Sequence, residues 1–437
     1  MPAVTPNNWR GRVVAEVCVV IVDPYSSGSM LADALQAQGT RCLALESSPV
    51  FPPSMKSKYR AERFFANLLH EGDLAATLER VRRYHPTHVV PGFESGVELA
   101  EWLSHKLGLP GNSPELAAAR RDKFLMGDVV KGSGLTTARQ YQSKSVEALL
   151  DWVDANLDWP VVVKPPKSVA SDQVRLCHNE QEVRIAAAAI LDNANILGLR
   201  NDAVLVQEFL DGTEFVVDLV HCQGRSKVTG VWQYGRSESA CGVGYDTMSL
   251  LPYAGDLQSA LCEYARLVSS VLGIRYGPAH CEIMWVDEQP ILVEVGARLT
   301  AGINAVLSRI CGGISQLDET IQIILDPEHF SDTFEERPVL TKQGVNVFLS
   351  PPYPGRLVRS HGLDVIRQLP TLYSMSVAME PGDQLKHVAG RVTLVHPDSE
   401  LIKHDIAVIR QLEQEGIFEM EAAASTERDG LRGTGNI

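Results

Sequence analysis

The sequence lacks long hydrophobic runs, paired cysteines and any excess of basic residues. Its apolar runs, such as Ile185–Leu191, are far shorter than the roughly 20 residues of a membrane-spanning helix, so we expect no membrane partner. The eight cysteines include no C-x-x-C pair, which argues against a zinc site and a disulfide framework. A formal charge of -14 disfavours a nucleic-acid partner. Because the N-terminal residues lack the basic-then-apolar order of a secretory signal, we expect a cytoplasmic protein with small-molecule substrates.

The chain has enough apolar sequence for two or three packed domains, with 437 residues of which 45% are hydrophobic. Residues 1–112 alternate between apolar runs and helical patterns, which predicts an α/β domain with a doubly wound parallel sheet. The turn Asp23–Ser29 has one glycine where dinucleotide-binding folds have G-x-G-x-x-G, so NAD binding is disfavoured. The breaker-rich stretch Leu109–Pro114 predicts a domain boundary. Residues 113–133 should form linker helices, one of them over Arg120–Met126.

Two lysines, Lys123 and Lys164, are candidates for binding an anion. Lys123 lies in the predicted linker helix, where a solvated surface lysine is the simpler interpretation. Lys164 ends a buried-type strand, and an ammonium beside an apolar strand needs an anion. The loop over residues 167–174 offers backbone N–H groups and the hydroxyls of Ser168 and Ser171 to phosphate oxygens. An ordinary exposed hairpin explains that loop equally well.

A further strand is predicted over residues 204–210, and the turn Asp211–Gly212 ends it. Free backbone groups at such a strand end can hydrogen-bond the edge of an adenine. The carboxylate of Glu214, just beyond the turn, can accept hydrogen bonds from ribose hydroxyls. This pattern is weak on its own.

The strongest local signal is a predicted hairpin over Ala279–Val286 and Ile291–Arg298. Because side chains alternate between the two faces of a strand, its apolar face should carry Ala279, Cys281, Ile283 and Trp285 with Ile291, Val293, Val295 and Ala297. The other face then carries His280, Glu282 and Met284 with Leu292, Glu294, Gly296 and Arg298. Neighbouring carboxylates repel unless a cation lies between them, and hard oxygen ligands suit Mg²⁺. The alternative is that Arg298 merely bridges two exposed glutamates.

These motifs occur in a fixed order: Asp122-Lys123, then Val163-Lys164-Pro165, then Gln207-Glu208-Phe209-Leu210 with Glu214, then His280-x-Glu282 and Glu294-x-Gly296-Ala297-Arg298. The ordered set resembles the ATP-grasp superfamily over about residues 15–410. The resemblance implies that ATP phosphates contact Lys123, Lys164, Ser168 and Ser171. It also implies that Gln207, Glu208, Phe209, Leu210 and Glu214 bind the nucleoside. Glu282 and Glu294 would hold Mg²⁺, and Mn²⁺ would fit the same ligands.

The resemblance also implies an ATP-grasp fold with three parts. Residues 134–211 should form a small α+β lid, and residues 212–420 should form a catalytic domain with an antiparallel sheet. From about residue 340 we expect an appended cap, and residues 421–437 should be a disordered tail. A homodimer is compatible with the sequence.

Within the superfamily, residues 91–96 and 294–302 are most similar to the L-amino-acid α-ligases, which make dipeptides. The implied reaction activates a carboxylate as an acylphosphate, which an amine then opens. The implied catalytic residues are Arg298, Glu282 and Glu294. The polar segment 236–246 is interpreted either as a loop able to close over the amino acids or, equally well, as a plain surface loop. Substrate contacts are expected at Glu94, Tyr245, Asp246, His280, Arg298 and Gly302, although Glu94 could equally be a structural acid.

Three positions depart from the family pattern. Ala170 and Gln173 replace glycines that many relatives have in the phosphate loop, and Gly296 stands where many have asparagine. Two other functions stay open: a carboxylase or nucleotide-pathway ligase acting through carboxyphosphate, and a non-catalytic nucleotide-binding protein. The two glutamates and the arginine argue against the second of these.

Overall fold

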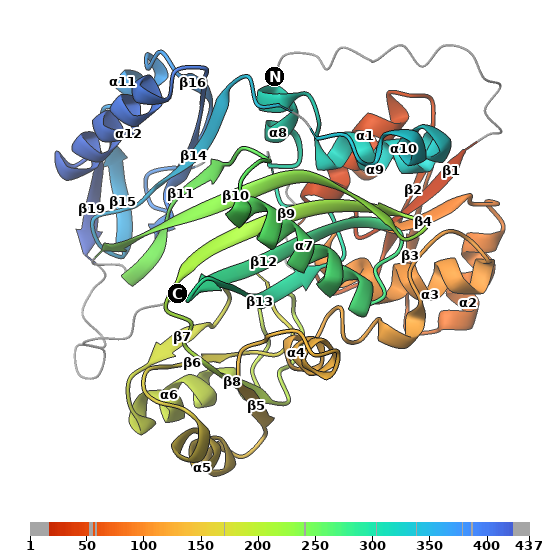
Figure 1. The fold of residues 1–437 in the computed structure, drawn as a ribbon, viewed down its shortest axis with the longest axis horizontal. Coiled ribbons are helices and arrows are strands. Elements are labelled where there is room, and N and C mark those ends of the chain that lie inside the picture. Colours follow the sequence, from red (N-terminus) through yellow and green to blue (C-terminus); the bar gives the residue numbers. More distant parts are fainter. Residues whose placement is uncertain are drawn as a thin grey trace.

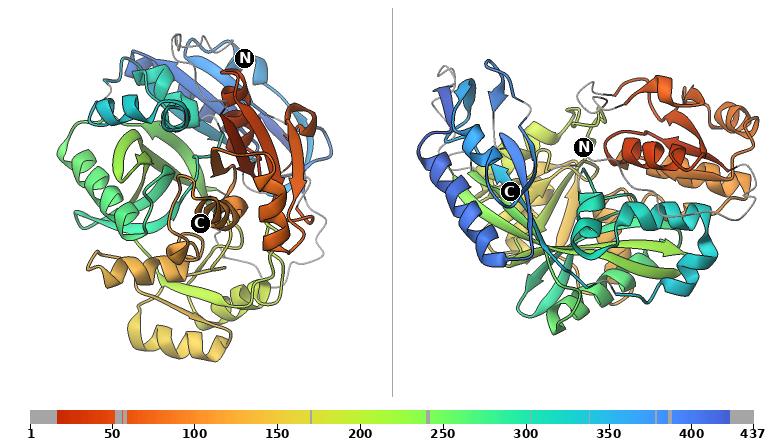
Figure 2. Two further views of the ribbon diagram at one scale, coloured as in Figure 1. Left: turned by 90° about the vertical axis from the view of Figure 1, so that its right-hand side faces the viewer. Right: turned by 90° about the horizontal axis from the view of Figure 1, so that it is seen from above.

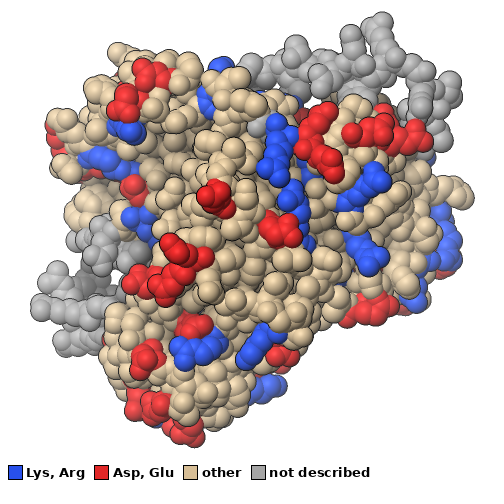
Figure 3. Space-filling model, in the orientation of Figure 1, with Lys and Arg blue, Asp and Glu red and all other residues tan. Residues whose placement is uncertain are grey.

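The computed structural model describes residues 17–422, except 52–55, 57, 58, 170, 240, 241, 303, 338, 378, 386 and 387. A large central sheet is flanked by a parallel-sheet domain, a small sheet below it and a C-terminal extension above it (Figures 1 and 2). Within these described ranges, no helix is long and apolar enough to span a membrane. Acidic and basic side chains are interspersed on the face shown in Figure 3.

The N-terminal part is built on a four-stranded parallel sheet in the order β3-β2-β1-β4. Its strands are β1 (Cys18–Val22), β2 (Arg41–Glu46), β3 (Ala66–Leu69) and β4 (His88–Pro91). Helix α1 (Ser27–Gln36) packs on one face, and α2 (Leu74–Arg82) and α3 (Val97–Leu107) pack on the other. Three short 3₁₀ helices cover Ala61–Arg63, Glu94–Gly96 and Pro114–Leu116. The strands of this sheet are almost entirely apolar. This composition fits the arrangement, because helices cover both faces of the sheet.

A second, antiparallel four-stranded sheet has the order β5-β8-β6-β7. Its strands are β5 (Gln140–Ser143), β6 (Val161–Lys164), β7 (Arg175–Cys177) and β8 (Val204–Glu208). Helices α5 (Val146–Asn156) and α6 (Glu180–Ile190) share a core with this sheet. Helix α4 (Lys123–Gly132) precedes it in the chain.

The central sheet has eight strands in the order β13-β12-β9-β10-β11-β14-β18-β16, and every neighbouring pair is antiparallel. Its strands are β9 (Thr213–Cys222), β10 (Arg225–Ser239), β11 (Gly242–Leu250), β12 (Gly277–Val286), β13 (Gln289–Gly296), β14 (Gln343–Leu349), β16 (Leu372–Ser376) and β18 (Gly390–His396). Its helices are α7 (Asp256–Val271), α8 (Asn304–Gly312), α9 (Gln316–Leu325) and α10 (Pro327–Thr333). Strands β14, β18 and β16 thus continue the central sheet into the C-terminal extension.

The C-terminal extension, here called the cap, also contains a small separate sheet in the order β17-β15-β19. Its strands are β15 (Gly355–Ser360), β17 (Gln384–Leu385) and β19 (Phe418–Ala422). Helices α11 (Leu363–Arg367) and α12 (Ser399–Gln414) complete it. Of the predicted tail, Glu421 and Ala422 end strand β19, and residues 423–437 lie outside the described residues.

The structure corrects two local predictions. The linker helix begins at Lys123 rather than Arg120, because Asp122 caps it by accepting hydrogen bonds from the N–H groups of Phe124 (3.0 Å) and Leu125 (3.1 Å). The segment 236–246 is not a loop. Its described residues continue β10 and β11, two long strands that pair with each other.

Candidate active site

A cavity of about 710 Å³ lies where the central sheet, the small antiparallel sheet and the parallel-sheet domain meet. Most of the sequence-predicted site residues line it: Lys123, Lys164, Ser168, Ser171, Gln207, Phe209, Leu210, Glu214, Tyr245, His280, Glu282, Glu294 and Arg298. These side chains come from segments up to 175 positions apart in the sequence, so the fold brings them together. Of the other predicted positions in the described chain, Glu94, Glu208, Asp246 and Gly302 do not line the cavity.

The two glutamates face each other across the β12–β13 hairpin, where Glu282 and Glu294 are direct register partners. A two-residue turn joins the strands, with both residues at positive φ, as tight hairpins require. One part of the predicted register is wrong. A bulge after Glu282 pairs Ile283 with Leu292, so Leu292 enters the apolar core and Val293 lines the cavity. The bulge exchanges the faces of Leu292 and Val293 and leaves the carboxylate pair intact.

Both predicted lysines reach the same end of the cavity. Lys123 Nζ lies 2.6 Å from Glu294 Oε2 and donates to the backbone oxygen of Ser168 at 2.9 Å. Lys164 Nζ donates to Gln207 Oε1 at 2.8 Å. Burial and the nearby charge of Lys123 lower the pKa of Lys164 to about 8, against the opposing effect of the glutamates. A lysine so placed gains from a bound anion, because an anion favours its charged form.

Charges of both signs surround the glutamate pair. Burial would raise the pKa of Glu282, but the hydrogen bond and charge of His280, with the charges of Lys123 and Arg298, outweigh it and lower the pKa. Glu214 is buried beside the pair, and burial together with the charge of Glu282 raises the pKa of Glu214 despite its ion pair with Arg236. Among the described residues, no group of three or more His, Cys, Asp or Glu side chains is arranged to hold a metal. Two carboxylates therefore fit a divalent cation whose remaining ligands are phosphate oxygens and water. That is the usual way in which Mg²⁺ is bound with a nucleotide.

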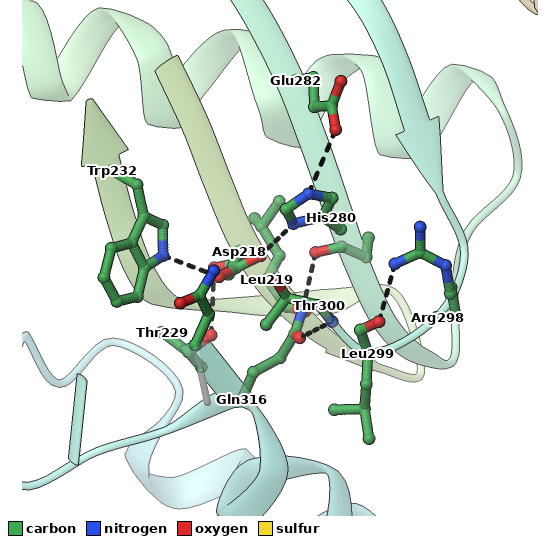
Figure 4. Close-up of polar contacts among 12 residues, drawn as sticks. Asp218, Leu219, Thr229, Trp232, His280, Glu282, Arg298, Leu299, Thr300 and Gln316 are labelled. Carbon is green, nitrogen blue, oxygen red and sulfur yellow. Dashed lines mark hydrogen bonds and ion pairs between the residues drawn. The ribbon is translucent and has the colours of Figure 1, made fainter. Parts of the chain in front are cut away.

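His280 links the glutamate pair to the interior of the sheet (Figure 4). Its Nδ1 lies 2.7 Å from Asp218 Oδ1, and its Nε2 lies 3.4 Å from Glu282 Oε1. The indole N–H of Trp232 donates to the other Asp218 oxygen at 2.8 Å. Burial lowers the pKa of His280, but the hydrogen bond and charge of Asp218, aided by Glu282, outweigh it and raise the pKa to about 9. The imidazole thus orients one carboxylate of the pair.

Arg298 follows strand β13 and makes an ion pair with Glu94, Nε to Oε2, at 2.6 Å. The second oxygen of Glu94 lies 2.5 Å from Arg121 Nη1. Burial would raise the pKa of Glu94, but the two guanidinium groups lower it to about 2. A Cβ atom at Gly296 would lie 3.1 Å from Glu94 Oε2 and 3.3 Å from Arg298 Cζ. The missing side chain at this position therefore makes room for the Glu94–Arg298 pair.

Comparison with known proteins places this geometry in a family. The model of the ATP-grasp domain matches residues 157–306. Dapdiamide A synthase from Enterobacter agglomerans is 31% identical over 408 residues, covering 90% of this chain and 95% of that protein. The chain belongs to the ATP-grasp ligases.

Solved structures show the same fold. The L-amino acid ligase from Bacillus licheniformis has a TM-score of 0.72 at 18% identity, covering 93% of this chain and 99% of that one. An N5-carboxyaminoimidazole ribonucleotide synthetase solved with ADP has a TM-score of 0.67 at 16% identity, covering 92% and 98%. This ATP-grasp chain is an ATP-dependent carboxylate–amine ligase that forms amide bonds between small molecules and uses a divalent metal ion.

The loop after β13 in this ATP-grasp enzyme is held from two sides. Gln316 of α9 accepts a hydrogen bond from the Thr300 N–H at 2.7 Å and donates to the backbone oxygens of Leu219 and Ala279 (Figure 4). The hydroxyl of Ser27, at the start of α1, donates to the Thr300 carbonyl. The parallel-sheet domain and the central sheet thus fix this loop together, and Arg298 with it.

Several predicted residues have structural partners. Glu208 pairs with Arg139, Nε to Oε2, at 2.6 Å, and Asp246 pairs with Arg410 of α12 at 2.7 Å. Both oxygens of Glu94 are taken by arginines, which favours the structural interpretation of that acid. Of the predicted phosphate loop, Ser168 donates to Asp172 at 2.8 Å, Gln173 has φ 58°, and Ala170 lies outside the described residues.

Besides Arg139 and Arg410, sequence reasoning missed the charged partners Arg121, Asp218 and Arg236. Arg121 stands two residues before the predicted Lys123, and Arg236 begins the polar segment 236–246, so both were visible as charged residues near predicted motifs. Asp218 lies between Val217 and Leu219 in an otherwise apolar stretch of its strand. A lone acid at such a position is a signal that a buried partner exists.

Proposed function

We propose that this enzyme joins two L-amino acids into a dipeptide, with conversion of ATP to ADP and phosphate. The observation that carries the proposal is the arrangement of Glu282 and Glu294 opposite Lys123, with Arg298 held by Glu94 at the border of the same cavity. The similarity to dapdiamide A synthase over nearly the whole chain supports an amino-acid-derived substrate.

The proposed reaction begins when a carboxylate oxygen of the donor amino acid attacks the γ-phosphorus of ATP and the bond to the β-phosphate oxygen breaks. The product is an acylphosphate, and ADP leaves. Lys123 and Lys164 balance phosphate charge, and the protein contributes mainly positioning and electrostatic stabilisation. Glu282 and Glu294 would hold Mg²⁺, which supplies further charge neutralisation at the phosphates.

In the second step the amine of the acceptor amino acid attacks the acyl carbon, loses a proton, and displaces phosphate. Negative charge develops on the acyl oxygen during this step. Arg298 is the cation that can stabilise this charge. Its Nε contacts Glu94 and its Nη1 donates to the Leu299 carbonyl at 2.8 Å, so the guanidinium is held in a fixed position. Nη2 is then the N–H group that can face the substrate.

The test is a coupling assay with purified protein, ATP, Mg²⁺ and pairs of amino acids, in which phosphate release and product mass are measured. We expect phosphate release that requires two amino acids, and a product whose mass equals their sum minus water. If bicarbonate replaces the second amino acid as the requirement for ADP formation, the enzyme is a carboxylase acting through carboxyphosphate. The similarity in fold to an N5-carboxyaminoimidazole ribonucleotide synthetase is the reason for including bicarbonate in the assay.

A further inference from the structure

The cap contributes one cation, Arg391, to the neighbourhood of the cavity. Arg391 lies on β18, directly opposite Phe348 of β14. A Cβ atom at Gly302 would lie 3.2 Å from Arg391 Nη1 and 3.4 Å from Nη2, so the guanidinium covers the face of that glycine. Gly302 follows Ala301, which lines the cavity.

The strand register places Arg391 on the side of the sheet that faces the cavity. Thr393, two residues further along β18, shares this face. Its hydroxyl donates to Asn346 Oδ1 at 2.8 Å, and the Asn346 amide donates to Asn304 Oδ1 at 2.6 Å. Asn304 lines the cavity. The guanidinium therefore lies beside the cap end of the cavity, behind Gly302 and next to the lining residues Ala301 and Asn304.

Arg391 is half-buried and, within the described part of the chain, has neither a hydrogen-bond acceptor nor a carboxylate partner. Each cation that lines the cavity has one. Lys123 is paired with Glu294, Lys164 with Gln207, Arg236 with Glu214 and Arg298 with Glu94. Burial of a guanidinium without an anion is unfavourable, and here it lowers the pKa of Arg391. The site is thus complete only when an anion is bound.

The surroundings of Arg391 suit an amino acid better than a phosphate. Its cross-strand neighbour Phe348 lies 6.0 Å from Tyr245, and Tyr245 lies 4.6 Å from Tyr234, measured between ring centroids. Both tyrosines line the cavity. An aromatic wall next to a guanidinium offers one surface for an apolar side chain and one group for a carboxylate.

The proposed reaction needs such a group. The donor carboxylate is consumed when it becomes an amide, but the acceptor amino acid keeps its α-carboxylate from binding to product release. We propose that Arg391 binds the α-carboxylate of the acceptor amino acid. Gly302 is then required because a side chain at that position would occupy the space of the Arg391 guanidinium. This assignment rests on the proposed dipeptide-forming function.

The experiment compares an acceptor amino acid with its own primary amide, using the pair of amino acids that the wild-type enzyme couples best. An amino-acid amide has no free carboxylate, so it can serve only as acceptor. We expect the wild-type enzyme to show a KM roughly 10- to 100-fold higher for the amide, as loss of a charged hydrogen-bonded pair implies. In Arg391→Gln, the KM for the free acid should rise by about that factor and approach the KM for the amide.

Arg359→Gln is the matched control, because Arg359 is an exposed cap arginine on β15 that pairs with Glu419. It should leave both KM values unchanged. Arg391→Lys should restore part of the preference for the free acid, because the charge remains without the bidentate geometry.

Two outcomes would overturn the assignment and they differ from failure of the proposed function. If Arg391→Gln raises the KM for acid and amide equally, Arg391 is structural. If the variant keeps the wild-type preference, the carboxylate is bound elsewhere. If the wild-type enzyme couples no amino acids in any pair, the dipeptide function itself is wrong, and the assignment of Arg391 falls with it.

Discussion

The hairpin glutamates line the cavity and Glu94 lies behind the cavity wall, and the charges of these two acidic groups are balanced in opposite ways. Glu94 has one carboxylate between the guanidinium groups of Arg121 and Arg298, and its pKa falls to about 2. The hairpin has two facing carboxylates, Glu282 and Glu294, with His280 beside the first at 3.4 Å and Lys123 as the ion-pair partner of the second. The first group is neutralised by the chain itself. Because Asp218 shares His280, the second group keeps negative charge that a cation from solution can balance, which supports the proposed role of the pair as metal ligands.

The strongest test of this difference is Glu294→Gln, which removes the charge of one carboxylate of the pair and keeps the shape of the side chain. We expect kcat to fall by at least about 100-fold, because charge stabilisation at the phosphates is lost. The free energy of unfolding should change little, since relief of the repulsion between like charges offsets the loss of the ion pair with Lys123. Phosphate release and urea unfolding measure the two effects.

The matched control is Glu288→Gln, an exposed residue in the turn of the same hairpin. It should change neither quantity. Wild-type turnover in Glu294→Gln would show that the pair does not hold the metal.

Glu94→Gln should show the reverse pattern, with the larger effect on stability. It leaves the buried guanidinium of Arg121 and the half-buried one of Arg298 facing a neutral amide, and breaking a buried ion pair in this way is unfavourable by about 3 to 5 kcal/mol. Activity should also fall, because Arg298 loses the partner that fixes its position. Urea unfolding at pH 7 gives the stability change. A variant as stable as the wild type would mean that the three charges contribute little to folding.

The pH dependence of stability sharpens the same point. Arg121 and Arg298 outweigh burial and lower the pKa of Glu94 from 4.5 to about 2, a difference worth about 3 kcal/mol. A lowered pKa gives stability that is fully present above pH 4.5 and is lost as pH falls through 2. The difference in unfolding free energy between wild type and Glu94→Gln should therefore be constant from pH 7 to 5 and shrink below pH 4.5. A difference that does not change with pH would contradict this origin.

The sequence allowed prediction of the glutamate pair because strand alternation is a local property, with a period of two residues. The order of the lysines and glutamates then carried the resemblance to the ATP-grasp superfamily, and that resemblance implied the fold and the nucleotide. The partners of these residues could not be predicted, because they depend on contacts between distant segments. Glu94 and Arg298 are 204 positions apart, and no local pattern relates them.

The errors have the same origin. The bulge that moves Leu292 into the core depends on how β13 packs against α7 and β12, which a strict alternation does not contain. The polar segment 236–246 looked like a loop because its side chains are polar. Long antiparallel strands at a cavity border can carry such residues, since one of their faces contacts substrate and solvent instead of the core.

The smallest expected effect tests why Gly296 lies between the two acidic groups. In Gly296→Ala the new Cβ would lie 3.1 Å from Glu94 Oε2 and 3.3 Å from Arg298 Cζ, so the ion pair must shift by a few tenths of an ångström. We expect kcat to fall roughly tenfold, because misplacement of a positioned charge by less than 1 Å is enough for such a loss. The Mg²⁺ concentration for half-maximal activity should stay unchanged, since Glu282 and Glu294 keep their places. Gly132→Ala, where a Cβ meets open space, is the control. A change in the Mg²⁺ requirement instead of kcat would show that Gly296 acts on the glutamate pair, and that the two acidic groups are not independent.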